Sequence, residues 1–118
     1  MRLIESVPNF SEGRRHDVIE QIADECRKVA NVWVLDYSSD PNHNRSVITL
    51  AGEPDGVEKA LFNMTKKARD LIDLKNHSGE HPRMGATDVI PLIPVMNTTK
   101  EECIALSRKL GKRIGEEL

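Results

Sequence analysis

Residues 54–74, PDGVEKALFNMTKKARDLIDL, form the clearest helical pattern in the chain and provide the starting point for its fold. Pro54 suits the first turn of a helix, where no backbone donor is needed. The apolar side chains recur every three or four residues and share one face, while the opposite face is charged. These apolar residues are Val57, Ala60, Leu61, Met64, Ala68, Leu71 and Ile72. The pattern predicts a helix from Pro54 to about Leu74 that packs on a core.

The sequence before this helix predicts three strands and another helix. Residues 2–8, 32–37 and 46–50 are short runs rich in apolar or β-branched side chains, and each is bounded by turn-forming residues. Residues 14–30 carry a second apolar stripe with helical spacing, which predicts a helix between the first two strands.

The sequence after it predicts one more strand and a third helix. Residues 88–95 have strand character but contain Pro91 and Pro94, and each proline removes a hydrogen-bond donor from the sheet. This strand is therefore expected at a sheet edge. Thr98 and Glu101 have the spacing of a capping box, so the third helix is expected to begin there.

The resulting order, βαββαβα, is typical of the α+β class. It predicts a ferredoxin-like sandwich, in which a four-stranded antiparallel sheet has two crossover helices on one face, with an added C-terminal helix. The 118 residues, 38% hydrophobic and 31% charged, suit a single domain spanning residues 1–118. This fold hosts enzymes, ligand-binding modules and RNA-binding proteins, so it does not decide the function.

Composition argues against several classes of protein. Seventeen Lys and Arg are scattered among nineteen Asp and Glu, and two Phe, one Trp and one Tyr offer little for stacking bases, so RNA or DNA binding is disfavoured. No apolar run approaches the roughly 20 residues that span a bilayer, and the N-terminus does not resemble a signal peptide. We expect a cytoplasmic protein in which Cys26 and Cys103 are buried free thiols.

Residues 79–88, GEHPRMGATD, are the strongest candidate for a reaction site. Pro82 pushes His81 towards an extended backbone, which holds the imidazole on a stiff loop. Histidine titrates near neutral pH and is well suited to take and return a proton. The plain alternative is a surface turn that happens to contain a histidine.

Charged neighbours of His81 have candidate roles of their own. Arg83 offers a planar set of donors that matches a carboxylate, and Glu80 or Asp88 could orient the imidazole or tune its pKa.

Zinc binding is a weaker alternative for the same segment. His77 and His81 stand four residues apart, and His43 could approach them in space. That spacing aligns two histidines only on a helix, and Gly79 and Pro82 argue against a helix there. We therefore expect no metal site.

Two further loops follow predicted strands and carry binding groups. Asn9 lies in the segment 7–13, and Asn44 and Arg45 lie in the segment 36–45. Asparagine both donates and accepts hydrogen bonds, and Arg45 could bind a substrate carboxylate. Alternatively, the asparagines only close turns and Arg45 only pairs with a surface acid.

Several motifs together resemble the N-terminal subdomain of the glutamate formimidoyltransferase (formiminotransferase) family. They occur in the family's order: Val7-Pro-Asn-Phe-Ser-Glu-Gly13, Asn44-Arg45, Gly52-Glu53-Pro54, Leu71-Ile72-Asp73, Gly79-Glu-His-Pro-Arg-Met-Gly-Ala86 and Glu101-Glu-Cys103. The resemblance covers nearly the whole chain, and several motifs in one order are more specific than any single motif.

The resemblance implies an activity. The family transfers a formimino group from N-formimino-L-glutamate to tetrahydrofolate, a step in histidine breakdown and one-carbon metabolism. It also implies that His81 is the catalytic acid/base. Substrate or folate binding is then expected of Asn9, Asn44, Arg45, Arg83 and Gly85.

Two departures qualify the resemblance. Family members often carry an acid two positions after the residue that matches Asp36, whereas this chain has Ser38 there, which leaves Asp36 and Asp40 as candidates to orient His81. Family enzymes also have a C-terminal subdomain, and folate lies between the two subdomains. The chain is therefore expected to supply half of the site, to work with that subdomain in the same or another chain, and to form a homodimer. The alternative is a non-catalytic regulatory module that binds folate or an amino acid.

Overall fold

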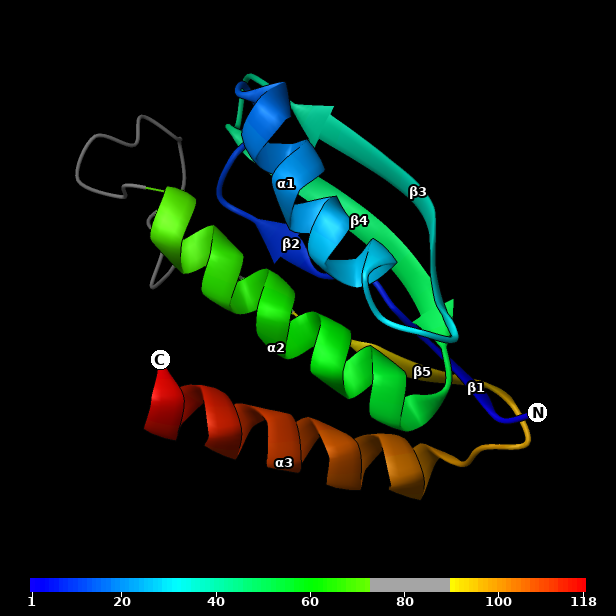
Figure 1. Cartoon of the computed structure of the whole chain (residues 1–118). Coiled ribbons are helices and arrows are strands. Elements are labelled where there is room, and N and C mark those ends of the chain that lie inside the picture. Colours follow the sequence, from blue (N-terminus) through cyan, green and yellow to red (C-terminus); the bar gives the residue numbers. More distant parts are fainter. Residues whose placement is uncertain (73–89) are drawn as a thin grey trace.

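The structure, a computed structural model, describes residues 1–72 and 90–118, which form an antiparallel sheet with helices on one side (Figure 1). The described elements, in chain order, are β1 (Leu3–Ser6), β2 (Asn9–Phe10), α1 (His16–Arg27), β3 (Val32–Asp40), β4 (Arg45–Gly52), α2 (Pro54–Leu71), β5 (Leu92–Met96) and α3 (Lys100–Glu117). The predicted α+β class and the predicted alternation of strands and helices are confirmed.

The sheet is organised around β4. One edge of β4 pairs along its whole length with β3, and its other edge pairs first with β2 and then with β1. β5 pairs with β1, so the lateral order is β3, β4, β1 together with β2, and β5. All of these pairings are antiparallel.

Over the residues that the structure describes, the sheet has five strands instead of the expected four, because residues 9–10, which follow the first predicted strand, also pair with β4 as β2. Pro8 lacks the backbone donor that a continuous strand would use, and β2 resumes the pairing with Asn9 opposite Val47. The carbonyl of Pro8 still accepts a hydrogen bond from the Ile48 N–H at 3.2 Å. The segment between β1 and β2 therefore stays attached to β4.

The edge position of the last strand is confirmed. Within the described residues β5 pairs only with β1, and Pro94 lies opposite Ile4. β5 begins at Leu92 and ends at Met96, whereas residues 88–95 were predicted. The first two predicted positions, 88 and 89, lie outside the described residues.

Both crossover helices are shorter than predicted. α1 begins at His16 because the Glu12 carboxylate accepts the backbone N–H groups of Arg14 and Arg15, which hold a turn instead of a helix. α2 begins at Pro54 as predicted and ends at Leu71, since the backbone of Ile72 is extended.

The cap of α3 lies one residue later than predicted. The Thr99 hydroxyl accepts a hydrogen bond from the Glu102 N–H at 3.1 Å and is the N-cap. Thr98 lies one residue before the cap, and its hydroxyl donates to the Leu3 carbonyl at 3.0 Å. The capping sequence therefore both starts α3 and ties the preceding turn to β1.

Apolar side chains fill the space between the sheet and the helices. In β4 the buried residues alternate with half-buried ones, so every second side chain faces α1 and α2. The largest fully buried side chains include Ile4, Phe10, Ile19, Ile22, Ile48, Leu50, Leu61 and Met64. Cys26 and Cys103 belong to this core as free thiols, as predicted, and burial raises the pKa of Cys26 to about 11.

The face of the sheet that points away from the helices, here called the open sheet face, has no covering layer among the described residues. It carries the half-buried residues of β4 and the residues opposite them in β1, β2 and β3. Its apolar members include Trp33, Ile93 and Val95, which are 48%, 44% and 55% exposed.

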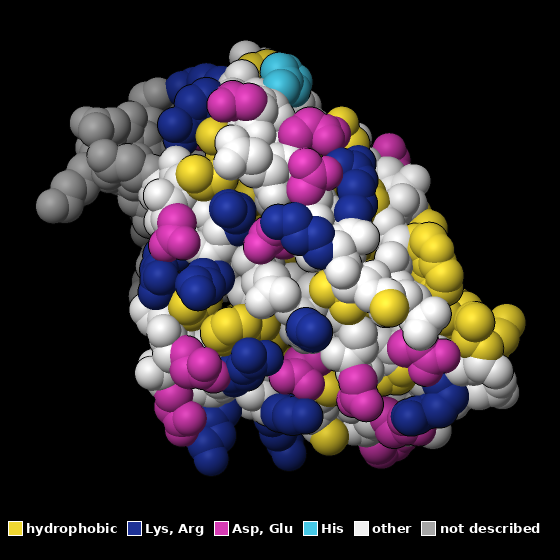
Figure 2. Space-filling model, viewed as in Figure 1, with side chains coloured by type: hydrophobic (Ala, Val, Ile, Leu, Met, Phe, Trp, Pro, Cys, Tyr) yellow, Lys and Arg dark blue, Asp and Glu magenta, His cyan; other side chains and the backbone are white. Residues whose placement is uncertain are grey.

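The helical side of the molecule looks different. Figure 2 shows positive and negative side chains intermixed over the helices, while hydrophobic side chains gather along the margin beside β3 and near the N-terminus. Within the described residues, no helix combines the length and the apolar character needed to cross a membrane.

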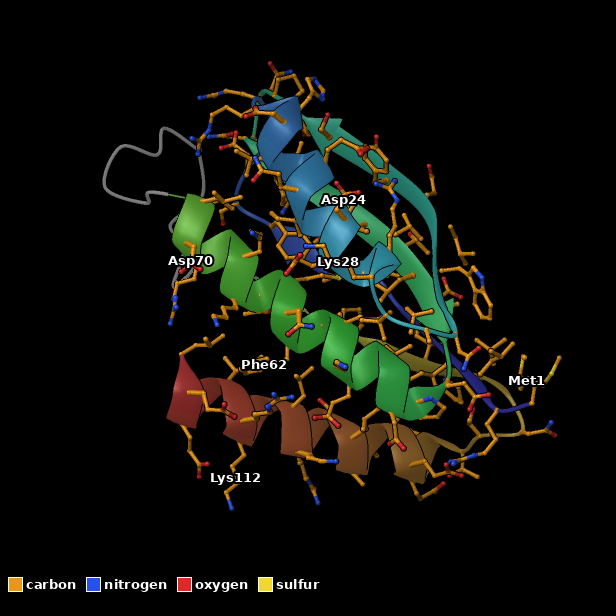
Figure 3. All side chains as sticks on the ribbon, in the orientation of Figure 1. Met1, Asp24, Lys28, Phe62, Asp70 and Lys112 are labelled. Atoms are coloured by element: carbon orange, nitrogen blue, oxygen red, sulfur yellow. The ribbon has the colours of Figure 1, made fainter. Side chains whose placement is uncertain are left out.

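α3 is attached to α2 by charge as well as by apolar packing. Glu58 on α2 is buried, and its carboxylate lies 3.1 Å from Lys109 Nζ and 3.8 Å from an Arg113 nitrogen. The Arg113 guanidinium also stacks 3.7 Å from the centre of the Phe62 ring, on the side of α2 that faces α3 (Figure 3). These contacts fix α3 beside α2.

Candidate functional site

Two predicted binding residues meet at one end of the open sheet face. Asn9 of β2 lies directly opposite Val47 of β4, and Arg45 lies two residues from Val47 on the same strand. Residues that are opposite each other, or two apart along a strand, share a face of the sheet. The structure therefore brings the side chains of Asn9 and Arg45 together on the open sheet face.

Arg45 is in a position to bind an anion. Its side chain is half-buried, and within residues 1–72 and 90–118 it forms no ion pair. Asp40 lies opposite Arg45 in the β3–β4 pairing, yet the Asp40 carboxylate is engaged elsewhere. A guanidinium in this state has its donors available for a ligand carboxylate.

Asp40 is held by the turn that joins β3 to β4. One carboxylate oxygen lies 2.6 Å from Nδ1 of His43, and the other accepts the backbone N–H groups of Asn42 and His43. The hydrogen bond with the His43 ring, and after it those from the backbone, lowers the pKa of Asp40 below its ordinary range. The carboxylate that was a candidate to orient His81 is thus bound to another histidine.

Asp36, the other acid considered from β3, is exposed on the open sheet face. It lies opposite Thr49, and Ser38 lies between it and Asp40 on the same face, opposite Val47. Within the described residues its carboxylate forms no ion pair. Asp36 is therefore free to face a ligand or a covering layer on this side of the sheet.

Asn44 is buried, whereas Asn9 and Arg45 are half-buried. The Asn44 side chain is 5% exposed, and its Oδ1 accepts the Gly13 backbone N–H at 2.8 Å. Its φ of 50° lies in the left-handed region, which asparagine tolerates better than most residues. The bond joins the loop after β2 to the turn before β4.

Gly13 allows an unusually close approach of these two segments. A Cβ at this position would lie 2.4 Å from the backbone N of Arg45 and from the Asp40 carbonyl oxygen. Only a residue without a side chain fits between these backbone atoms.

The buried side chain of Glu12 holds the same loop through hydrogen bonds. Its side chain is nearly fully buried, and it accepts hydrogen bonds from the N–H groups of Arg14 and Arg15 and from Arg15 Nε at 2.6 Å. Burial alone would raise the pKa of Glu12, but the bonds from Arg15 and Arg14 outweigh burial and lower it. The ionised carboxylate therefore stabilises the loop.

We expect the substitution Glu12→Gln to remove a pH-dependent part of the stability. A lowered pKa in the folded state stabilises the protein above the unfolded value, about 4.3, and this contribution is lost as pH falls through the lower folded value. At pH 7 the variant should be less stable by about 1–3 kcal/mol, and the difference should shrink between about pH 5 and pH 3. Urea unfolding at several pH values measures this.

The exposed acid Glu117, which pairs with Arg113 at 3.0 Å on α3, provides the control. Glu117→Gln should change stability by less than about 1 kcal/mol at pH 7. If the deficit of Glu12→Gln stayed constant from pH 7 to pH 3, the assigned role of the ionised carboxylate would be wrong.

Comparison with known proteins places this arrangement in a family. Residues 3–118 match the model of the formiminotransferase domain, N-terminal subdomain. The chain belongs to the formiminotransferase family. Glutamate formimidoyltransferase from Thermoplasma acidophilum is 51% identical over 118 residues, which are 100% of this chain and 39% of that protein. The Streptococcus pyogenes serotype M1 protein of the same name is 44% identical over 99% of this chain and 39% of its own length.

A larger relative carries the same segment. Formimidoyltransferase-cyclodeaminase from Dictyostelium discoideum is 48% identical over 99% of this chain, and the match covers 22% of that protein. The chain thus spans 22–39% of the length of these curated relatives.

Several residues predicted for a formiminotransferase site lie outside the described residues. They are His81, Glu80, Arg83, Gly85 and Asp88, together with the zinc candidate His77. Within residues 1–72 and 90–118, no three His, Cys, Asp or Glu side chains are placed to hold a metal ion. The roles of these residues stay predictions.

Sequence reasoning did not find the structural roles of four residues of this formiminotransferase subdomain: Glu12, Gly13, Asp40 and His43. Glu12 and Gly13 appeared only as part of a turn-rich segment, although the close approach of Gly13 to another segment cannot be read from local sequence. The spacing of Asp40 and His43 does carry a local signal, since residues three apart in a tight turn can face each other.

Proposed function

We propose that the chain is the N-terminal part of a glutamate formimidoyltransferase. In this proposal it helps to transfer the formimino group of N-formimino-L-glutamate to tetrahydrofolate, a step in histidine degradation. The observation that carries the proposal is the match of residues 3–118 to the N-terminal subdomain of the family.

The geometry of the open sheet face supports this proposal. Both proposed substrates carry carboxylates, and the Arg45 guanidinium forms no ion pair within the described part of the chain. Asn9 lies beside it on the same face and can donate and accept hydrogen bonds. We assign carboxylate binding to Arg45 or Arg83, and a part in orienting the substrate to Asn9.

The proposed chemistry needs one proton to leave and one to arrive. As N5 of tetrahydrofolate attacks the formimino carbon, N5 loses a proton and a new C–N bond forms. The bond from that carbon to the glutamate nitrogen then breaks, and this nitrogen gains a proton. A single imidazole can do both in turn, and we assign this role to His81.

We further propose a ferredoxin-like sheet whose open face is covered by a second subdomain. The lateral order of β3, β4, β1 and β5, all antiparallel, supports the ferredoxin-like arrangement. Exposed Trp33, Ile93 and Val95 on the open sheet face support a covering partner. In this proposal folate lies between the sheet and that partner. That the protein is cytoplasmic and forms a homodimer stays a prediction.

A recombination assay tests the proposed function. The chain is mixed with a separate polypeptide that contains the part of the Thermoplasma acidophilum enzyme beyond the matched region. Formation of formimino-tetrahydrofolate is then followed, alongside a tetrahydrofolate titration by calorimetry. We expect turnover only when both polypeptides are present; each polypeptide alone is the control.

The outcomes separate the two candidate functions. Turnover upon mixing supports the transferase. Binding of folate or glutamate by the chain, with no turnover in any mixture, contradicts the proposal and favours a non-catalytic binding module.

A further inference from the structure

We infer that Asn44 is a positioning residue, and that it acts through Gly13 to set the relative placement of Asn9 and Arg45. The inference rests on the proposed function in that these two side chains are assigned to the substrate. It gives Asn44 a different role from direct substrate binding.

The segment that carries Asn9 pairs with β4 as β2 and is held by a hydrogen bond on either side of that pairing. On one side of Asn9, the Pro8 carbonyl accepts the Ile48 N–H at 3.2 Å. On the other side, the Gly13 N–H donates to Asn44 Oδ1 at 2.8 Å. Asn9 therefore lies on a short span that is bound at one end to β4 and at the other end to Asn44, the residue directly before β4.

The hydrogen bond at Gly13 depends on the side chain of Asn44. Its side chain is buried, so its Oδ1 bonds to Gly13 without competition from bulk water. Gly13 packs directly against the backbone of Arg45, where a Cβ would be 2.4 Å from the Arg45 N. Breaking the bond would thus release the loop next to the residue that is proposed to bind a carboxylate.

Another side-chain hydrogen bond also joins this loop to the β3–β4 turn. Arg14, which lies in the turn before α1, donates from Nε to the Pro41 carbonyl at 2.8 Å. The bond from Arg14 is exposed, whereas the bond that Asn44 Oδ1 accepts from the Gly13 N–H is buried. Removal of the Asn44 side chain should consequently loosen this junction.

The test distinguishes the effect of losing the hydrogen bond from the effect of changing the backbone conformation. Asn44→Gly keeps the left-handed backbone, with φ of 50°, but removes the acceptor, whereas Asn44→Asp keeps an acceptor oxygen. Asn31 also has a left-handed backbone, with φ of 62°, and lies exposed before β3. Asn31→Gly is therefore the matched control.

Hydrogen exchange and side-chain signals of the ¹⁵N-labelled chain, recorded by NMR without substrate, provide the readout. In Asn44→Gly we expect the Gly13 amide to exchange about 10- to 100-fold faster relative to the core amide of Leu61. The side-chain signals of Asn9 and Arg45 should shift as well. Asn44→Asp should restore both, and Asn31→Gly should leave both unchanged.

Two results would overturn the inference. One is an unchanged Gly13 exchange rate in Asn44→Gly. The other is faster Gly13 exchange while the signals of Asn9 and Arg45 stay in place, which would make the bond purely structural. Neither result depends on transferase activity, so a failure of the inference is distinguishable from a failure of the proposed function.

The recombined transferase supplies a second readout. If Asn44 acts through Arg45, the KM for N-formimino-L-glutamate should rise about tenfold or more in Arg45→Ala, and adding Asn44→Gly should raise it little further. Fully additive effects would contradict the inference. If the recombined enzyme shows no turnover, that result counts against the proposed function. The NMR result would still decide the role of Asn44.

Discussion

His81→Asn is expected to lower the kcat of the recombined transferase by a factor of about 10² to 10⁴, the usual contribution of a general acid/base. Asparagine keeps a polar side chain of similar size but cannot take a proton from N5 of folate or return one to the glutamate nitrogen. Binding of tetrahydrofolate should stay within about threefold of the unchanged protein, since the proposed role concerns proton transfer. Steady-state kinetics and a folate titration measure the two quantities.

His43 provides the informative control. Its Nδ1 lies 2.6 Å from the Asp40 carboxylate, so it is the described histidine that most resembles a carboxylate-oriented base. His43→Asn should leave kcat within about threefold of the unchanged protein. Near-normal turnover of His81→Asn, or a large loss in His43→Asn instead, would refute the assignment of His81.

Gly13→Ala is expected to destabilise the chain by about 3 kcal/mol, at the upper end of the range for overpacked sites. The added Cβ would lie 2.4 Å from the Arg45 N and the Asp40 oxygen, and 2.5 Å from the Arg45 oxygen. All three atoms belong to the backbone of paired strands, so they cannot move aside as a flexible side chain would. Because domains are stable by only about 5–15 kcal/mol, urea unfolding should show a clear fall in the midpoint.

Gly111 is a glycine at which an added methyl group has room and should have the opposite effect on stability. It lies on the exposed side of α3, and no atom is within 4 Å of a Cβ built there. Gly111→Ala should therefore stabilise the chain by about 0.5–1 kcal/mol through helix propensity. Equal effects of the two substitutions would show that the close approach at Gly13 is not the cause.

Local sequence patterns predicted the helices and strands well where the structure depends on residues that are close together in the sequence. The stripe from Val57 to Ile72 identified α2, and the prolines near Leu92 identified an edge strand. The boundaries were less accurate because individual hydrogen bonds and the conformation of single residues set them. Thr99 rather than Thr98 caps α3, and the Thr98 hydroxyl bonds to Leu3, a residue that is far away in the sequence.

The same distinction applies to the candidate site. Residue chemistry identified Asn9 and Arg45, but their meeting on one face depends on the pairing of β2 with β4, which a break at Pro8 made hard to foresee. Asn44 was read as a binding residue because its type is polar, whereas the structure buries its side chain against Gly13. Residue types indicated the chemistry, and the register decided which side chains could act together.

The uncovered state of the open sheet face has a consequence for the strength of ion pairing. Arg45 and Asn9 are at present partly hydrated, and water weakens the attraction between a guanidinium and a carboxylate. If an apolar layer settles on Trp33, Ile93 and Val95, the local dielectric constant falls and the same charges attract each other more strongly. A carboxylate ligand and the covering layer would then reinforce each other's binding, because each gains from the water that the other displaces.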